Sequence, residues 1–352
     1  MKAEWKGFLT NAGAELGDDG RVLSFGNPER EYKVALTGNV FADMSHYSLV
    51  AVHGEDARDF LQGQFSNDLR RIDKKHSLLN AYCSPKGRML ANFRVFHHGD
   101  SFYLHMPSSM VEATVKRLRM FVLRSRVTIE DTVDTFISIG LSGPGAEDEL
   151  ARATGFTPPG EIDGVIQNDH QLIIRVPGIH PRFQLYAGFD TACKIWNALN
   201  VDCAPVGAGA WNLLEIQAGL PTILPETVEA FVPQMVNLQL VDGVSFKKGC
   251  YPGQEVVARM QYLGKLKRRM YLAHVRADEP PRAGLDLFDA KGDEQSVGKV
   301  VDSEPHPNGG YALLAVVQIA SAEQGDVRLG DKDGPALEYQ SLPYSFPVAE
   351  SA

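Results

Sequence analysis

The sequence predicts an α+β protein built of two α+β units followed by a small all-β unit at the C-terminus, a barrel or a sandwich. Three observations predict this fold class. Predicted strands followed by an amphipathic helix occur twice, about 80 residues apart. Short alternating segments at regular spacing fill the chain after residue 267. The length of 352 residues also suits two or three domains.

The first α+β unit is expected at residues 46–145. A helix carrying Phe60 and Leu61 follows its first strand, and apolar residues at helical spacing from Val111 to Leu118 predict a second, amphipathic helix. The strands predicted from alternation and turn signals are 47–52, 78–83, 88–96, 101–106, 127–129 and 135–141. The glycine-rich residues 1–45 before this unit are expected to form an irregular lead-in.

The second α+β unit is expected at residues 146–266, and the C-terminal β-barrel at residues 267–352. Predicted helices in the second unit are 146–154, a helix holding Ile195 and Trp196, and 208–218, with strands at 170–176 and 183–187. The barrel strands are predicted at 270–275, 285–288, 297–301 and 311–319.

Composition excludes several classes of protein. The net charge of -9 argues against general affinity for nucleic acids or membranes. The four cysteines form no CxxC pair, no zinc spacing and no disulfide framework, so we expect no metal site and a reducing compartment. The charged N-terminus precedes no long apolar segment, and no stretch approaches the ~20 apolar residues of a membrane span. We therefore expect a cytoplasmic protein.

The most reactive-looking segment is residues 247–255, KKGCYPGQE. Cys250 follows two lysines, and neighbouring cations lower a thiol pKa from its free value of ~8.5. Gly249 and Gly253 predict a tight structural turn that leaves the thiol near the surface. A cysteine is equally at home as a small apolar residue at the end of a hairpin. The residues alone leave both interpretations open.

Basic residues continue beyond this segment. Between Lys247 and Arg269 the chain carries seven basic residues and one acidic residue, Glu255, which favours a local anion or RNA site over a plain solvated surface only modestly. Tyr47 and Trp211 are candidate stacking surfaces for a flat heteroaromatic ligand, although an aromatic ring alone is more often part of a core.

Residues 248–255 resemble the signature of the folate-binding YgfZ-type proteins, which are related to the glycine-cleavage T protein, an aminomethyltransferase. The resemblance extends over residues 45–345. Its other matching segments are 60–68, 82–89, 218–221, 231–238 and 342–345.

The resemblance implies that the two α+β units and the barrel surround a central cavity for tetrahydrofolate or a derivative. It places Tyr47, Trp211 and Gln217 at this cofactor pocket. It implies that the protein is an accessory factor supporting assembly or repair of iron-sulfur enzymes, including those that methylthiolate tRNA. The implied partners are folate and such client enzymes, and direct nucleic-acid binding is not expected.

The resemblance also implies that Cys250 is a functional thiol. In this hypothesis Lys248 lowers its pKa, Tyr251 walls the pocket, and Gln254 and Glu255 orient the loop. The thiol alone could not hold a cluster, because all-thiolate clusters take four cysteines.

The alternative function is a folate-dependent aminomethyltransferase or demethylase, which rests on the shared fold. Two departures from the T protein count against it. No carboxylate occurs at residues 88–92, after Gly87, where the T protein carries an acidic pair. Gln217 stands where the T protein has a glutamate, so it offers a pterin no charge-assisted acceptor.

Overall fold

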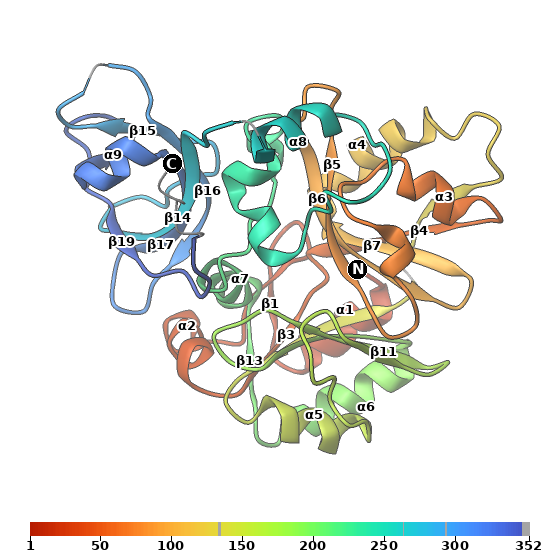
Figure 1. The fold of residues 1–352 in the computed structure, drawn as a ribbon. Coiled ribbons are helices and arrows are strands. Elements are labelled where there is room, and N and C mark those ends of the chain that lie inside the picture. Colours follow the sequence, from red (N-terminus) through yellow and green to blue (C-terminus); the bar gives the residue numbers. More distant parts are fainter. Residues whose placement is uncertain (133–134, 263, 293, 347–352) are drawn as a thin grey trace.

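The computed structural model describes residues 1–132, 135–262, 264–292 and 294–346. Three large β-sheets, each with its own helices, surround one central helix, α7 (Figure 1), and β1 and β2 form a further two-stranded sheet. The α+β class predicted from the sequence is therefore confirmed. The last residues of the expected barrel unit, 347–352, lie outside the described residues.

The first sheet has five strands in the order β5-β6-β7-β4-β8 and is antiparallel throughout. Helix α4 packs on β4, β6, β7 and β8, and short turns join β5, β6 and β7 as the turn signals predict. The elements are β4 (Tyr47–His53), α3 (Ala57–Gln62), the 3-10 helix η1 (Leu69–Arg71), β5 (Leu78–Cys83), β6 (Met89–His98), β7 (Ser101–Pro107), α4 (Ser108–Arg119) and β8 (Thr128–Asp131).

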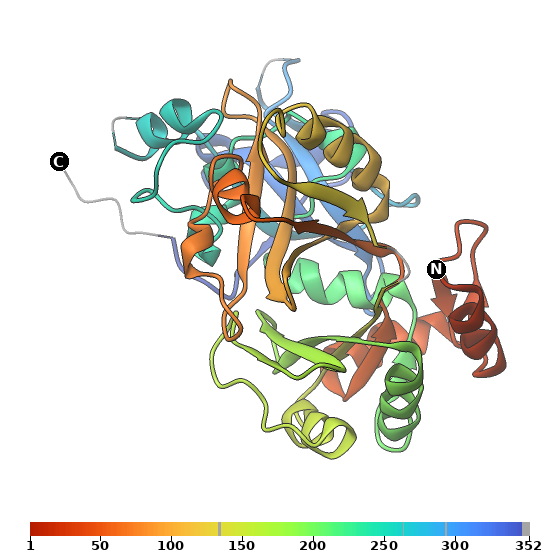
Figure 2. The ribbon, with the colours of Figure 1, turned by 90° about the vertical axis from the view of Figure 1, so that its right-hand side faces the viewer.

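The second sheet has six strands in the order β10-β11-β12-β9-β3-β13. Helices α5 and α6 cover its outer face, and α7 lies on the inner face (Figure 2). The elements are β3 (Val40–Asp43), β9 (Ile137–Ser142), α5 (Ala146–Thr154), β10 (Val165–Gln167), β11 (Gln171–Val176), β12 (Arg182–Ala187), α6 (Phe189–Leu199), β13 (Ala204–Val206) and α7 (Ala208–Gln217).

The prediction that residues 1–45 are irregular is wrong. They form α1 (Ala3–Asn11), β1 (Glu15–Leu16), β2 (Val22–Ser24), α2 (Pro28–Thr37) and β3. Strand β3 pairs with β9, about 100 residues further along the chain, and all four of its residues are buried. A segment of four buried residues is too short to show an alternation of apolar and polar residues. Its pairing with β9 identifies it as a strand. The unit boundaries expected at residues 45, 145 and 266 stay a prediction.

The third sheet has six strands in the order β18-β15-β16-β17-β14-β19 and curls into a half-barrel, as the alternating segments predict. The elements are β14 (Arg268–Val275), β15 (Asp286–Asp289), β16 (Gly298–Pro305), β17 (Tyr311–Gln318), α9 (Ile319–Gln324), β18 (Val327–Leu329) and β19 (Glu338–Gln340). The connection from α7 to this sheet contains the 3-10 helices η2 (Pro225–Thr227), η3 (Pro233–Val236) and η4 (Leu238–Val241), then α8 (Gln254–Tyr262).

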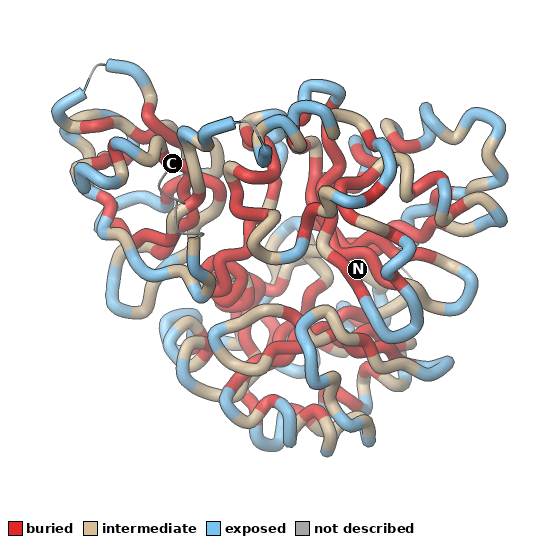
Figure 3. Tube along the Cα trace, viewed as in Figure 1, coloured by how far each residue is buried: buried red, intermediate tan, exposed pale blue. Residues whose placement is uncertain are grey.

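Most residues of helix α7 are buried (Figure 3). This agrees with its sequence, because a helix that is apolar on nearly all sides is expected to be enclosed by other elements. Leu213 and Ile216 belong to the core shared with the first sheet and the half-barrel. Trp211 packs instead with residues of β3 and α2, and its ring lies against Gly140 of β9, where a Cβ atom would fall 2.5 Å from the ring. The central helix thus ties the three units together.

Candidate functional site

A narrow pocket lies at the centre of the molecule, beside the C-terminal half of α7. Its volume is about 60 Å³. It is lined by residues of the first sheet, the second sheet, α7 and the connection that follows α7. Tyr47, at the start of β4, lines this pocket and also a second, wider cleft of about 770 Å³. Of the sequence-predicted cofactor residues, Tyr47 is therefore the one whose side chain faces both openings.

Two flat rings form one wall of the central pocket. Tyr47 stacks on His105 of β7 with ring centroids 4.8 Å apart and planes inclined by 24°. Burial, together with the neighbouring His46 and Arg94, lowers the pKa of His105 to about 3, so this imidazole is neutral at physiological pH. Its Nε2 atom is buried without a hydrogen-bond partner among the described residues. A buried polar atom without a hydrogen-bond partner is able to form a hydrogen bond with a bound ligand.

A buried ion pair stands behind the pocket. The Arg182 guanidinium on β12 donates a hydrogen bond of 3.0 Å to the Glu215 carboxylate on α7. The Arg182 side chain is fully buried, and its guanidinium carbon lies 5.3 Å from the centre of the Trp211 ring. Glu215 lines the pocket, so the pair fixes a carboxylate at its wall.

Trp211 and Gln217 lie differently from what the resemblance implies. Trp211 is fully buried one layer behind the pocket, beneath Arg182. Gln217 is half-buried at the last turn of α7 and is not among the described residues that line the pocket. Helix geometry explains the difference, because residues two positions apart face different sides, and Glu215 takes the inward position. Their assigned roles in folate binding stay predictions.

Asn92, on β6, occupies the region where the T protein is acidic. It lines the pocket, but its amide is engaged by the backbone on both sides. Its Nδ2 donates to the carbonyl of Pro221 at 2.7 Å, and its Oδ1 accepts from the N–H of Ile223 at 2.8 Å. Asn92 therefore fixes the segment after α7 and has little capacity left for a ligand.

The Cys250 segment is a surface loop, and its thiol is exposed, as the turn residues predict. Gly253 has φ +80°, and a Cβ atom there would lie 2.4 Å from the carbonyl oxygen of Ser84. This contact packs the loop on the turn between β5 and β6. Gly249 has open space around it and no positive φ, so the two glycines of the predicted turn have different roles.

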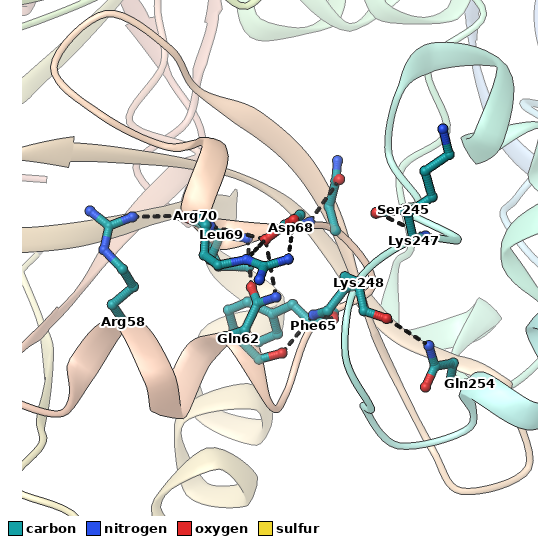
Figure 4. A network of polar contacts seen from close by, with 11 residues as sticks. Arg58, Gln62, Phe65, Asp68, Leu69, Arg70, Ser245, Lys247, Lys248 and Gln254 are labelled. Atoms are coloured by element: carbon teal, nitrogen blue, oxygen red, sulfur yellow. Dashed lines mark hydrogen bonds and ion pairs between the residues drawn. The ribbon is translucent and has the colours of Figure 1, made fainter.

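Lys248 is buried and holds this loop to the end of α3 (Figure 4). Its ammonium donates to the carbonyls of Gln62 at 2.6 Å and Phe65 at 2.5 Å. It also lies 5.1 Å from the centre of the Tyr251 ring. Burial lowers the pKa of Lys248 to about 8. These contacts direct the charge at backbone oxygens, and the described hydrogen bonds include none between Lys248 and the thiol.

The other residues of the motif frame the loop. Tyr251 is buried under Lys248, and Lys247 is exposed, with its side chain pointing away from the network (Figure 4). Gln254 and Glu255 begin helix α8, which the sequence analysis did not predict. The Gln254 amide donates to the Lys248 carbonyl at 3.3 Å and so supports the loop, whereas Glu255 is exposed.

The basic segment 247–269 is divided among different surroundings. Lys248 is buried, Arg268 donates to the carbonyl of Ser296, and the Arg269 guanidinium lies over the Phe346 ring. At least these three charges are therefore engaged within the protein, which weakens the RNA-binding interpretation.

The central pocket and the Cys250 loop are separate places. Strand β6 connects them, since Gly87 touches the loop and Phe93 lines the pocket. Six residues of strand correspond to roughly 20 Å. The predicted cofactor residue Tyr47 and the predicted thiol are thus not brought into contact.

The sequence analysis did not identify Glu215 and His105, which line the pocket, or Arg182, which holds the Glu215 carboxylate. An arginine at the start of an otherwise apolar strand and a glutamate within an apolar helix were the available signals, because such residues are rarely buried unless paired.

Among the described residues, no helix is long and apolar enough to cross a membrane. Within the same residues, no group of three or more His, Cys, Asp or Glu side chains could hold a metal ion. The four cysteines are unpaired.

Comparison with known proteins places this geometry in a family. Residues 18–158 match the family described as GCVT N-terminal domain. The chain is 30% identical over 312 residues to the tRNA-modifying protein YgfZ of Colwellia psychrerythraea strain 34H, covering 88% of this chain and 94% of the relative. It is 31% identical over 304 residues to the tRNA-modifying protein YgfZ of Klebsiella pneumoniae strain 342, covering 86% and 92%.

Among solved structures, the fold is similar to that of the glycine cleavage system aminomethyltransferase T from Bartonella henselae. The TM-score is 0.74 at 19% identity, and the match covers 96% of each chain. At this identity the likeness establishes the fold alone, an aminomethyltransferase T-like arrangement with a curled C-terminal half-barrel. The sequence identity along nearly the whole length of the relatives shows that this chain belongs to the YgfZ family.

Proposed function

We propose that this protein binds a reduced folate in its central pocket and acts in tRNA modification as an accessory factor for iron-sulfur enzymes. Its relatives are tRNA-modifying proteins, and residues 18–158 match the GCVT N-terminal domain. The observation that carries the folate proposal is the pocket wall itself, where the stacked Tyr47 and His105 rings meet the Glu215 carboxylate.

The chemistry of this wall fits a pterin. The pyrimidine edge of a pterin presents adjacent N–H donors, which a carboxylate accepts in pairs. Glu215 supplies that carboxylate, fixed by Arg182, and the Tyr47 and His105 rings supply stacking surface. The unpartnered Nε2 of His105 gives a further polar contact. A volume of about 60 Å³ holds a few water molecules, so binding involves movement of side chains at the wall.

Cys250 is the proposed functional thiol. Its exposure on a loop held by Lys248 and Gly253 allows a client protein to reach it. The other three cysteines are buried or half-buried, and burial raises the pKa of Cys83 and Cys203 to about 12, so those two are poorly suited to act as thiolates. Cys250 thus acts as a single thiol toward a client, as a transient ligand or a redox partner, and does not hold a whole cluster.

Titration with 5-formyltetrahydrofolate tests the folate site. We expect saturable heat in a calorimeter, and Glu215→Gln is expected to weaken binding at least about tenfold because a charge-assisted acceptor becomes a neutral one. Gln217→Ala is the matched control on the same helix and is expected to bind as the wild type does. The reverse outcome, with Gln217→Ala weakened and Glu215→Gln unchanged, would assign the pterin edge to Gln217 instead.

Complementation of a deletion strain tests the thiol. We expect the Cys250→Ser variant to lose most tRNA methylthiolation, measured by mass spectrometry of tRNA digests, because a serine hydroxyl neither ionises at neutral pH nor binds iron as a thiolate does. The half-buried Cys193 supplies the matched control, and Cys193→Ser should restore the modification fully. Full restoration by Cys250→Ser would end the thiol proposal.

The aminomethyltransferase T-like fold is also compatible with a second function, that of a folate-dependent aminomethyltransferase or demethylase. The pocket argues against it, since Asn92 lies in the region of the missing carboxylates and both ends of its amide are held by backbone groups. Accumulation of methylene-tetrahydrofolate from N-methyl or aminomethyl donors and tetrahydrofolate would favour this function.

A further inference from the structure

The wider cleft lies between the half-barrel, the turn before β4 and the N-terminal residues. Its volume of about 770 Å³ is within the usual range for small-molecule sites. It shares Tyr47, Pro107 and Thr222 with the central pocket, but its polar groups are different. Strand β16 contributes two of them, Asp302 and Glu304.

Among the described residues these two carboxylates form no salt bridge, although the Arg21 guanidinium in the same cleft acts on both to lower their pKa. They are two residues apart on one strand and therefore lie on the same face. Among the described residues their hydrogen-bond donors are neutral. Asp302 accepts from the Ser303 N–H at 2.9 Å, and Glu304 accepts from the Tyr32 hydroxyl at 2.9 Å and the Asn212 amide at 3.2 Å.

Burial of Asp302 and Glu304 raises the free energy needed to ionise both carboxylates in the ligand-free protein. Burial, followed by the charge of Glu304, raises the pKa of Asp302 to about 7, and burial raises the pKa of Glu304 to about 7. Above pH 7 two negative charges then share one partly dehydrated space. A bound cation would offset both charges at once.

The remaining groups of the cleft show which kind of cation fits. Asp19 and Glu226 add negative charge, and Arg21 and Arg282 add positive charge, so the fully ionised cleft carries a net charge of about −2. His46 stays neutral, because burial and Arg21 lower its pKa to about 4, and its Nδ1 atom is buried without a partner. Two carboxylates beside a neutral imidazole acceptor suit an organic cation that carries several N–H donors.

We propose that this cleft is a second binding site, separate from the folate pocket, for a small organic cation whose ammonium or guanidinium group lies between Asp302 and Glu304. A charged N–H donor would satisfy both carboxylates, and the unpartnered His46 nitrogen offers it a neutral acceptor. The inference rests on the carboxylates and the cavity and does not require that folate binds.

Three four-carbon ligands of different charge test the charge preference. With full-length protein at pH 8, 1,4-diaminobutane is expected to bind in a calorimetric or NMR titration, and both the neutral 1,4-butanediol and the dianion succinate are expected to bind at least about tenfold more weakly. Tighter binding of succinate than of the diamine would overturn the proposal, since Arg21 and Arg282 would then govern the cleft.

Isosteric variants locate the site. Asp302→Asn combined with Glu304→Gln should weaken diamine binding at least about tenfold while leaving 5-formyltetrahydrofolate binding unchanged. The control is Asp331→Asn combined with Asp333→Asn, which removes the same charge from an exposed loop of the half-barrel and should bind the diamine as the wild type does. Equal binding by the wild type and the Asp302/Glu304 variant, or equal losses in both double variants, would refute the site.

The pH dependence gives an independent readout. Both carboxylates gain protons as the pH falls through about 7, whereas His46, with its pKa lowered to about 4, stays neutral between pH 6 and 8. Diamine affinity should therefore fall at least about fivefold from pH 8 to pH 6 in the wild type, and this dependence should disappear in Asp302→Asn/Glu304→Gln. If the double variant does not fold, Asp302→Asn alone decides, because the one hydrogen bond of this side chain within the described part of the chain is to the adjacent Ser303 N–H. A pH-independent affinity in the wild type would overturn the proposal.

Discussion

Replacing Arg182 by methionine is expected to destabilise the fold by about 3–5 kcal/mol, the usual cost of removing one partner of a buried ion pair. The Arg182 side chain is fully buried and the Glu215 side chain is 11% exposed, so the remaining carboxylate would have neither a cation nor free access to water. The 3.0 Å contact between them joins β12 to the central helix. A shift of the urea unfolding midpoint at constant slope measures the effect.

The double variant Arg182→Met/Glu215→Gln is the control for this pair. Because it removes both charges, it should recover much of the lost stability, and the difference between single and double variants gives the coupling between the two side chains. Arg152→Met removes an arginine from the exposed pair with Glu149 and should barely move the midpoint. Equal losses in the Arg182 single and double variants would mean that packing of the long side chain, not charge, matters here.

Replacing Gly253 by alanine is expected to detach the Cys250 loop and to abolish most of the thiol-dependent function. An alanine there would adopt φ +80° at a cost of about 1–2 kcal/mol, and its Cβ atom would overlap the Ser84 carbonyl oxygen at 2.4 Å. Overpacking against backbone adds about 1–3 kcal/mol. Limited proteolysis of the loop and tRNA methylthiolation in a deletion strain report the two consequences.

Gly249→Ala is the matched control, one residue before the thiol. A Cβ atom at Gly249 meets nothing within 4 Å, and its φ is not positive. This variant should keep both the protease resistance and the function of the wild type. If Gly249→Ala were as damaging as Gly253→Ala, the loop would need flexibility beside the thiol and not close packing on the β5–β6 turn.

The sequence predicted those elements that have a strong local signal. The turns between β5, β6 and β7, the amphipathic α4 and the alternating strands of the half-barrel lie close to their expected places. Elements without such a signal were missed. Strand β3 is stabilised by pairing with distant β9, and α8 follows directly on a glycine-rich turn.

Some features of the candidate site likewise followed from the local sequence, and others depended on distant contacts. The Cys250 motif was evident from its residues, and its exposure followed from the surrounding turn residues. The contacts of Lys248 did not follow, because its partners are carbonyls about 180 residues earlier in the chain. The hypothesis that this lysine activates the thiol stays a prediction, whereas its hydrogen bonds to Gln62 and Phe65 are a property of the structure.

The sequence by itself determined the α+β class, the C-terminal half-barrel and the resemblance carried by residues 248–255, since each of these depends on neighbouring residues along the chain. Only the tertiary structure decided that Glu215 lines the pocket while Trp211 lies behind it, and that Asp302 and Glu304 share a cleft with His46. The physical reason is that burial and charge pairing depend on which distant segments pack together, and a local pattern does not contain that information.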